Sequence, residues 1–241
     1  MIKLAPEAPW MAGLRAARAN VVPGLIVQGL MLSMLLAYYF YPPMRHWLDQ
    51  LAEIKSRWSY GYTALSSFFA GAVIPELLRV LVFQNAKVHR ANFKNLLFTV
   101  PFCCFMGVVV DFLYRCQAGW FGTEVSFAVV LKKVLVDQFL FNPLFSGPIS
   151  AWLYDWKNQG FRFEGTAAFF TAAYYRKVVL PILFATWGMW FPIVTILYSL
   201  PLQLQIPLFG LALSLWMILY TWMSEQRARV LTTAGYKSDH S

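Results

Sequence analysis

The sequence contains few charged residues. Lys, Arg, Asp and Glu account for 13% of its 241 residues, whereas a water-soluble domain carries about 25% charged residues. Hydrophobic residues account for 59%, aromatic residues for 18%, and the mean hydropathy is +0.53. So few charged side chains cannot cover a globular surface in water, which excludes a soluble domain. We predict an integral membrane protein whose main partner is the lipid bilayer.

Cysteine and histidine are equally scarce, and they do not group. The chain holds three of each: Cys103, Cys104, Cys116, His46, His89 and His240. No CxxC or mixed Cys/His spacing occurs, so we expect neither a disulfide framework nor a metal site. HExxH, GxSxG, GxGxxG and phosphate-binding glycine loops are absent as well. The sequence therefore predicts no enzyme activity and no cofactor.

Long apolar runs predict the membrane spans. A helix needs about 20 residues to cross a hydrocarbon core of roughly 30 Å. Four runs are long enough: Val21 to Tyr41, Gly61 to Val82, Leu96 to Leu113 and Val125 to Leu153. The fourth run includes Lys132, Lys133, Asp137 and Pro143, so we expect a kinked or broken helix there.

The C-terminal part of the chain contains the longest uncharged stretch. No charged residue occurs from Val178 to Met223, and a single helix of that length would measure about 69 Å, twice the bilayer core. Two spans must share the stretch, with a turn expected between Leu200 and Pro207. The fold class predicted is all-α, a polytopic bundle of six transmembrane helices in one membrane domain.

The net charge of +9 would suggest nucleic acid as a partner of a soluble protein. Here the basic residues lie between apolar segments, and no basic stripe with exposed aromatics occurs outside them. If the N-terminus is inside, six crossings place thirteen Lys and Arg on the inner side and four on the outer side. Such an excess is typical of the cytoplasmic or equivalent side. We predict both termini inside and no nucleic-acid partner.

Several polar residues fall inside the predicted spans, where a charge costs about 2.5 to 3.5 kcal/mol on insertion scales. The set is Glu76, Arg79, Asp111, Lys133, Asp137, Gln138 and Asn142. Three pairs have helical spacing and can meet on one face: Glu76 with Arg79, Asp111 with Arg115, and Lys133 with Asp137. These side chains line a polar path across the membrane, or they clamp helices to one another. The sequence leaves both interpretations open.

Two local features of the spans also bear on whether the polar residues line a path or clamp helices together. Asn142-Pro143 interrupts the fourth helix and frees backbone carbonyls, which indicates either a cavity or a proline kink satisfied by Gln138 or Asn142. Small residues four apart, Ser67 with Gly71 and Gly210 with Ser214, permit close approach of neighbouring helices.

The run from Lys132 to Pro143 resembles a signature of the Mpv-seventeen and peroxisomal twenty-two-kilodalton membrane protein family. A basic residue, then Asp137-Gln138, then Pro143 six positions after the aspartate match that signature. Further residues resemble the family's flanking motifs: Gly107, Tyr114, Trp190, Pro192, Pro201 and Trp216. Val108 and Leu113 stand where the family has proline and tryptophan. The resemblance covers 60–223, which leaves 1–59 as an N-terminal arm, first helix and loop, and 224–241 as a polar tail.

The resemblance implies a protein of the mitochondrial inner, peroxisomal or a related membrane, drawn with four spans and proposed to modulate permeability to small solutes. Charge alone fits a bacterial cytoplasmic membrane equally well. Our leading hypothesis is a small-solute channel lined by the seven polar residues. The alternative is a structural or assembly protein that docks a partner without an open pore, and a homo-oligomer fits either case. A lipid-modifying enzyme ranks last because no catalytic constellation is present.

Overall fold

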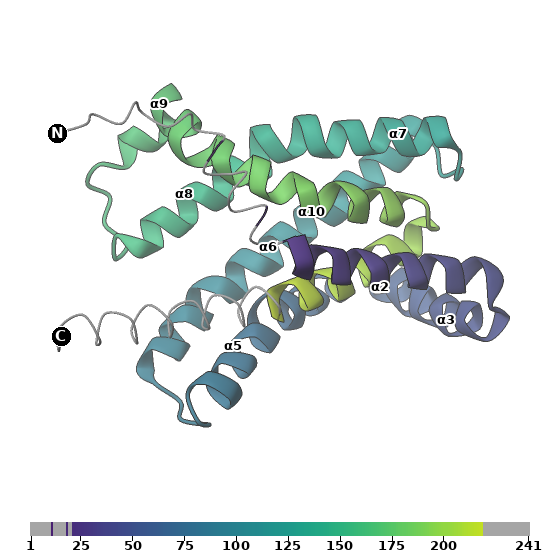
Figure 1. Cartoon of the computed structure of the whole chain (residues 1–241), viewed down its shortest axis with the longest axis horizontal. Coiled ribbons are helices and arrows are strands. Elements are labelled where there is room, and N and C mark those ends of the chain that lie inside the picture. The colour runs from purple at the N-terminus through teal and green to yellow at the C-terminus, as the bar shows by residue number, and fades with distance from the viewer. Residues whose placement is uncertain (1–10, 12–17, 19–20, 219–241) are drawn as a thin grey trace. The chain divides into compact units, whose positions relative to one another are not determined.

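The computed structural model describes Met11, Arg18 and residues 21–218, and that part of the chain is helical with no strand. Figure 1 shows the helices in chain order. The chain divides into two compact units, each built from segments far apart in sequence. Unit 1 comprises Met1–Pro42 and Arg115–Leu202, and unit 2 comprises Pro43–Tyr114 and Gln203–Ser241. The predicted all-α class is confirmed for the described residues.

Unit 1 contains α2, the end of α6, and the helices from α7 to α10. Their bounds are Val21–Phe40 (α2), Arg90–Phe121 (α6), Phe127–Val136 (α7), Gly147–Asn158 (α8), Ala172–Tyr174 (α9) and Leu180–Tyr198 (α10). Wider π-helical turns, Asp137–Ser146 and Tyr175–Val179, join α7 to α8 and α9 to α10, and Thr166–Phe170 forms a short 3₁₀ helix. Each π segment continues the helix without a break, so each joined set forms one run.

Helices α2 and α10 run parallel in unit 1. Gln28 Nε2 donates to the carbonyl of Gly188 at 3.0 Å, and Tyr39 Oη donates to the carbonyl of Ser199 at 2.8 Å. From the first of these hydrogen bonds to the second, the residue number rises along both helices, so the two helices run in the same direction. By contrast, contacts of Gln138 with Trp187 and of Asp155 with Tyr174 make the run from α7 to α8 antiparallel to that from α9 to α10.

Unit 2 contains α3 (Pro42–Trp58), the helical run Tyr60–Phe83, most of α6 and the helix Leu202–Ile218 from Gln203 onward. The run Tyr60–Phe83 consists of α4 (Tyr60–Phe68), α5 (Ile74–Leu78) and two π-helical segments, Phe69–Val73 and Arg79–Phe83. It packs antiparallel to α6, since Thr63 meets Asp111 and Glu76 meets Asn95. We call this pair of helices the hairpin.

Small residues let the helices of unit 2 approach closely. A methyl group at Gly107 would lie 1.9 Å from Ser67 Oγ, and one at Gly71 would lie 2.7 Å from Cys103 Sγ. A methyl group at Gly210 would lie 2.3 Å from Ser66 Oγ. These distances are shorter than van der Waals contact, so the backbones are as close as glycine permits. The prediction of close approach at Gly71 and Gly210 is confirmed.

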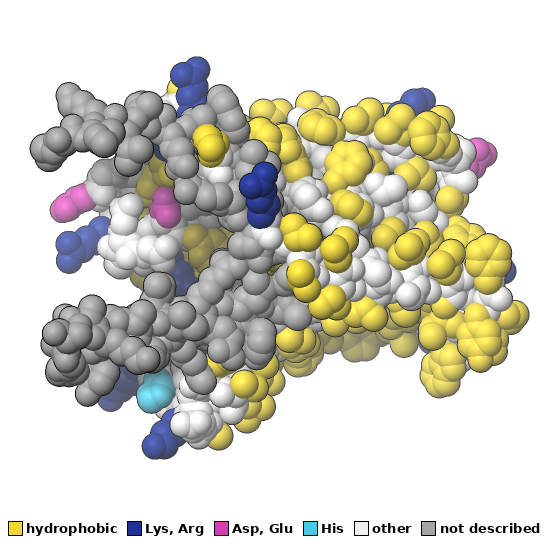
Figure 2. Space-filling model, in the orientation of Figure 1, with side chains coloured by type: hydrophobic (Ala, Val, Ile, Leu, Met, Phe, Trp, Pro, Cys, Tyr) yellow, Lys and Arg dark blue, Asp and Glu magenta, His cyan; other side chains and the backbone are white. Residues whose placement is uncertain are grey.

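Within residues 21–218, three helices are long and apolar enough to cross a membrane: Tyr60–Phe83, Arg90–Phe121 and Ala172–Tyr198. A fourth candidate is the pair formed by α2 and α3, which are separated by a break after Phe40. Figure 2 shows hydrophobic side chains over the surfaces of α2 and α7 that face the viewer. The chain thus has the helices of an integral membrane protein, and six crossings stay a prediction.

Three local expectations need correction or refinement. The outer loop expected after the first span is the helix α3. The expected turn is shorter than predicted: the chain leaves the helix at Ser199–Pro201, and both Gln205 and Pro207 are already helical. The fourth segment keeps its helix through Pro143 because π-helical turns accommodate the ring, although α7 and α8 point in different directions in Figure 1. The helix is bent but not broken.

Candidate functional site

Most of the buried polar residues in the described part of the chain gather in three clusters, two in unit 2 and one in unit 1. The Glu76 cluster comprises Glu76, Arg79, Asn92 and Asn95. The Asp111 cluster comprises Asp111, Lys55 and Thr63. The Asp137 cluster comprises Asp137, Gln138, Tyr198, Gln117 and Lys133.

In the Glu76 cluster, one carboxylate joins the two helices of the hairpin. Asn92 Nδ2 donates to Glu76 Oε1 and Asn95 Nδ2 donates to Glu76 Oε2, each at 2.5 Å. Arg79 Nη1 also donates to Oε2 at 3.0 Å, which confirms the ion pair expected from the spacing. Both carboxylate oxygens are satisfied, and the side chain of Glu76 is 6% exposed while that of Arg79 is 34% exposed. The arginine therefore reaches the protein surface, and the carboxylate does not.

The Asp111 cluster ties α3 to the other end of the hairpin. Lys55 Nζ donates to Asp111 Oδ2 at 2.5 Å and to the carbonyl of Ser59 at 3.1 Å. Thr63 Oγ1 donates to the same carboxylate at 2.6 Å. Both charged side chains are 4% exposed. The expected partner of Asp111 was Arg115, one turn away, and the structure adds Lys55, which the sequence reading placed in an outer loop.

The two clusters of unit 2 lie at opposite ends of the hairpin. Thr63 and Glu76 are about 20 Å apart along their helix, and Asn95 and Asp111 about 24 Å along α6, at 1.5 Å per residue. The contacts of Gly71 and Gly107 described above lie between them, together with a hydrogen bond from Cys104 Sγ to the carbonyl of Ala64 at 3.4 Å. A tightly packed seam of small side chains thus separates the polar clusters.

In the Asp137 cluster, Tyr198 occupies the centre. Its hydroxyl accepts from Gln117 Nε2 at 3.0 Å and donates to Asp137 Oδ2 at 2.8 Å. Gln138 Nε2 donates to the other carboxylate oxygen at 2.9 Å. Lys133 Nζ lies 5.9 Å from the centre of the Tyr198 ring, a cation–π distance. The expected ion pair of Lys133 with Asp137 is not formed, because Tyr198 takes the place of the lysine beside the carboxylate.

The Asp137 cluster contains polar groups that are buried without a hydrogen-bond partner. The side-chain oxygens of Gln117 and Gln138 accept no hydrogen bond from the described residues. Lys133 is 3% exposed, and its ammonium lies over the Tyr198 ring. Native proteins usually supply such groups with a partner or an ordered water molecule. The Asp137 cluster therefore contains buried amide oxygens without a hydrogen-bond partner, whereas no described side-chain atom of the Glu76 and Asp111 clusters is in that position.

The π-helical segment around Asn142-Pro143 has its freed carbonyls satisfied. Trp187 Nε1 donates to the carbonyl of Gln138 at 3.1 Å, and Tyr175 Oη donates to that of Pro143 at 3.1 Å. The Trp187 ring also packs on Phe139 with 5.4 Å between ring centres. Of the two readings of this motif, the structure supports the satisfied kink, with donors from the next helix and not from Gln138 or Asn142. The Asn142 side chain makes no hydrogen bond with described residues.

A groove of about 310 Å³ lies elsewhere in unit 2, between Tyr60–Phe83 and the last helix. Its lining includes Tyr62, Ser66, Phe69, Gly210 and Ser214. None of the seven predicted polar residues borders it. In the described part of the chain, no set of three His, Cys, Asp or Glu side chains is placed to bind a metal ion.

Six residues that complete the clusters were not among the predicted site residues: Lys55, Thr63, Asn92, Asn95, Gln117 and Tyr198. Two of them carried a usable signal, because Asn92 and Asn95 are three apart and face one side of a helix. The predicted structural residues Trp190 and Trp216 lie in helices, and Tyr114 is fully buried in α6.

Comparison of the chain with profiles of protein families, with curated proteins and with solved structures finds no match.

Proposed function

We propose that this chain is a structural or assembly protein of a membrane, in which buried polar residues clamp helices and line no open pore in unit 2. The observation that carries the proposal is the separation of the Glu76 and Asp111 clusters. Each cluster satisfies its own carboxylate, and the close-packed seam between them leaves no room for water. A polar path along the hairpin would need polar groups open to water at intermediate depth, whereas the buried Ser67 there is packed directly against Gly107.

The physical reason for such clamps is that lipid and the protein interior are equally apolar. Helices in a bilayer gain little from hydrophobic burial against each other, so close packing and hydrogen bonds between helices hold them together. Glu76 bonded to two asparagines of α6, and Asp111 bonded to Thr63, provide one such lock at each end of the hairpin. A hairpin fixed in this way offers a rigid surface on which a partner protein can dock.

The test is reconstitution of the purified full chain into liposomes loaded with small solutes. We expect no conductance and no solute release from the wild type. Asn95→Leu should lower resistance to unfolding and leave solute release unchanged, and Asn158→Leu, at an exposed position at the end of α8, serves as its matched control. Solute release by the wild type that changes in Asn95→Leu at unaltered stability would overturn the clamp proposal.

A second function, permeation of small solutes or protons through unit 1, is favoured by one observation. The Asp137 cluster buries two amide oxygens that lack hydrogen-bond partners among the described residues, with the buried Lys133 beside them. Water or a small polar solute would supply those partners, and ionisable residues at membrane depth commonly mark such paths. Lys133→Met tests this function in the same liposomes, with the exposed neighbour Lys132→Met as control. Release that is abolished only by Lys133→Met would establish it, and equal behaviour of both variants would exclude it.

A further inference from the structure

Helix α3 presents three different sides, and each side contains one class of residue. Leu48, Ala52 and Lys55 face the protein, and the exposed charged side contains Arg45, Asp49, Glu53 and Arg57. The third side is an apolar stripe of Trp47, Leu51, Ile54 and Trp58, spaced by four, three and four residues. This spacing places the four side chains in one line along a helix. We define these four residues as the α3 stripe.

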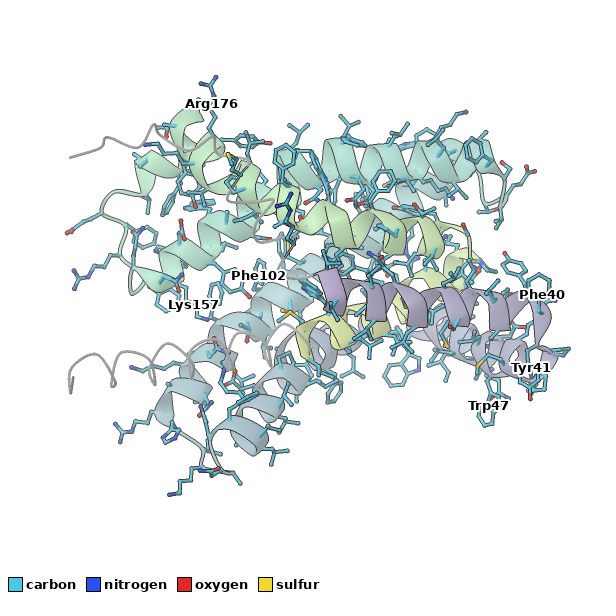
Figure 3. All side chains as sticks on the ribbon, viewed as in Figure 1. Phe40, Tyr41, Trp47, Phe102, Lys157 and Arg176 are labelled. Carbon is cyan, nitrogen blue, oxygen red and sulfur yellow. The ribbon has the colours of Figure 1, made fainter. Side chains whose placement is uncertain are left out.

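Three of the four residues of the α3 stripe are exposed in the structure, and Leu51 is half-buried. Trp47 is 69% exposed, Ile54 47% and Trp58 62%. In Figure 3 the Trp47 side chain points away from the ribbon. Two exposed tryptophans and an isoleucine on a helix of 17 residues form an apolar surface that requires a cover, because such patches mark interaction sites.

The position of α3 indicates what covers the stripe. Its C-terminal end is tied to the start of the helix Tyr60–Phe83, because Lys55 bonds to the carbonyl of Ser59 just before that helix and to Asp111, which also accepts from Thr63. The helix Tyr60–Phe83 is long and apolar enough to cross a membrane, and the ends of such a span lie at the membrane surface. Helix α3 therefore lies at the depth of the lipid headgroups.

The charges of α3 identify the kind of lipid surface. On the charged side, Arg45 pairs with Asp49 at 4.0 Å and Arg57 pairs with Glu53 at 2.6 Å. The remaining cation of the helix, Lys55, is buried against Asp111. The side that faces water thus has balanced charge and lacks the cluster of unpaired Lys and Arg that recognises anionic lipid.

We propose that α3 is an interfacial helix that lies along the membrane surface, with the α3 stripe among the lipid chains and the charged side in water. Such helices combine an apolar side, a charged side and low net hydrophobicity, and tryptophan is enriched at that depth. The occupant of the stripe is the bilayer itself, without preference for anionic headgroups. The proposal requires a membrane protein but does not depend on whether the polar clusters act as clamps.

The experiment is a spin-label scan of α3 in the full chain, with Cys103, Cys104 and Cys116 replaced by alanine. Single cysteines at Ile54 and Glu53, which are neighbours on different sides of the helix, carry a nitroxide in phosphatidylcholine liposomes, with and without phosphatidylglycerol. Collision rates with oxygen, which concentrates in lipid, and with a water-soluble nickel complex are then measured.

The proposal expects the label at Ile54 to collide more with oxygen, the label at Glu53 to collide more with nickel, and phosphatidylglycerol to change neither. Nickel access at both positions would show that the stripe faces water, and protection of Ile54 from both reagents would show a protein cover. Either result overturns the proposal. A third label, at the exposed Leu77 within Tyr60–Phe83, tests the membrane assignment separately, because nickel access there would contradict that assignment instead.

Discussion

The buried ion pair of Lys55 with Asp111 gives the sharpest prediction of stability. Lys55→Met keeps the length and apolar stem of the side chain but removes the ammonium. The carboxylate of Asp111, 4% exposed, would lose this ammonium and keep the hydrogen bond from Thr63 at 2.6 Å. Removing one partner of a buried ion pair is destabilising because the remaining charge loses the opposite charge that offset its removal from water.

The expected loss in free energy of unfolding is about 3 kcal/mol, the lower end of the range for breaking a buried pair. We choose the lower end because Thr63 continues to donate to the carboxylate. The double variant Lys55→Met with Asp111→Asn removes both charges and should recover more than half of the loss. The matched control is Arg57→Met on the same helix, whose exposed pair with Glu53 should contribute about 0 to 1 kcal/mol.

The assay is unfolding of the purified chain by increasing sodium dodecyl sulfate in dodecylmaltoside micelles, followed by far-ultraviolet circular dichroism. The three variants are compared with the wild type under one set of conditions. A loss in Lys55→Met no larger than that in Arg57→Met would refute the reasoning, because it would mean that the Asp111 carboxylate does not need the lysine. If Lys55→Met and the double variant lost the same free energy of unfolding, the explanation by an uncompensated charge would be refuted. The loss would then come from altered packing.

Three further predictions concern the close contacts and the Asp137 cluster. Gly107→Ala should cost about 1 to 3 kcal/mol in the same unfolding assay, because the new methyl group would overlap Ser67; Gly61→Ala, with open space around it, should be neutral or slightly stabilising. Tyr198→Phe should cost about 1 to 3 kcal/mol, because the buried groups that flank its hydroxyl lose a partner, and an unchanged midpoint would contradict that network. Trp187→Phe should cost about 1 kcal/mol through the unpaired carbonyl of Gln138, and faster amide hydrogen exchange in the π-helical segment would locate the effect.

Much of the helical architecture could be predicted from the sequence because hydropathy acts over whole segments. The helix Val21–Phe40 matches the first predicted span within one residue, and Tyr60–Phe83 encloses the second. The ion pair of Glu76 with Arg79 was also predictable, because both residues lie on one helix and helical spacing determines which side chains meet.

The partners that join different helices were not predictable. Asp137 and Tyr198 are separated by 61 positions, and no local pattern specifies which tyrosine reaches a given carboxylate. The same limit explains Lys55, whose spacing with Leu48 marks a buried side of α3 but not the aspartate 56 positions away. Average hydropathy also failed to distinguish α3 from a loop, because an amphipathic helix and a polar loop have similar average composition.

The parallel packing of α2 and α10 has a consequence for biosynthesis. Gln28 finds its acceptor 160 residues later, in α10, and at about 5 to 20 residues per second a ribosome needs roughly 8 to 30 s to reach it. During that interval the amide of Gln28 has no partner from α10, and α2 depends on its apolar length alone to stay in place. Helix α2 is therefore made early and locked late, and slowing translation before Gly188 should extend the period in which α2 is open to exchange or degradation.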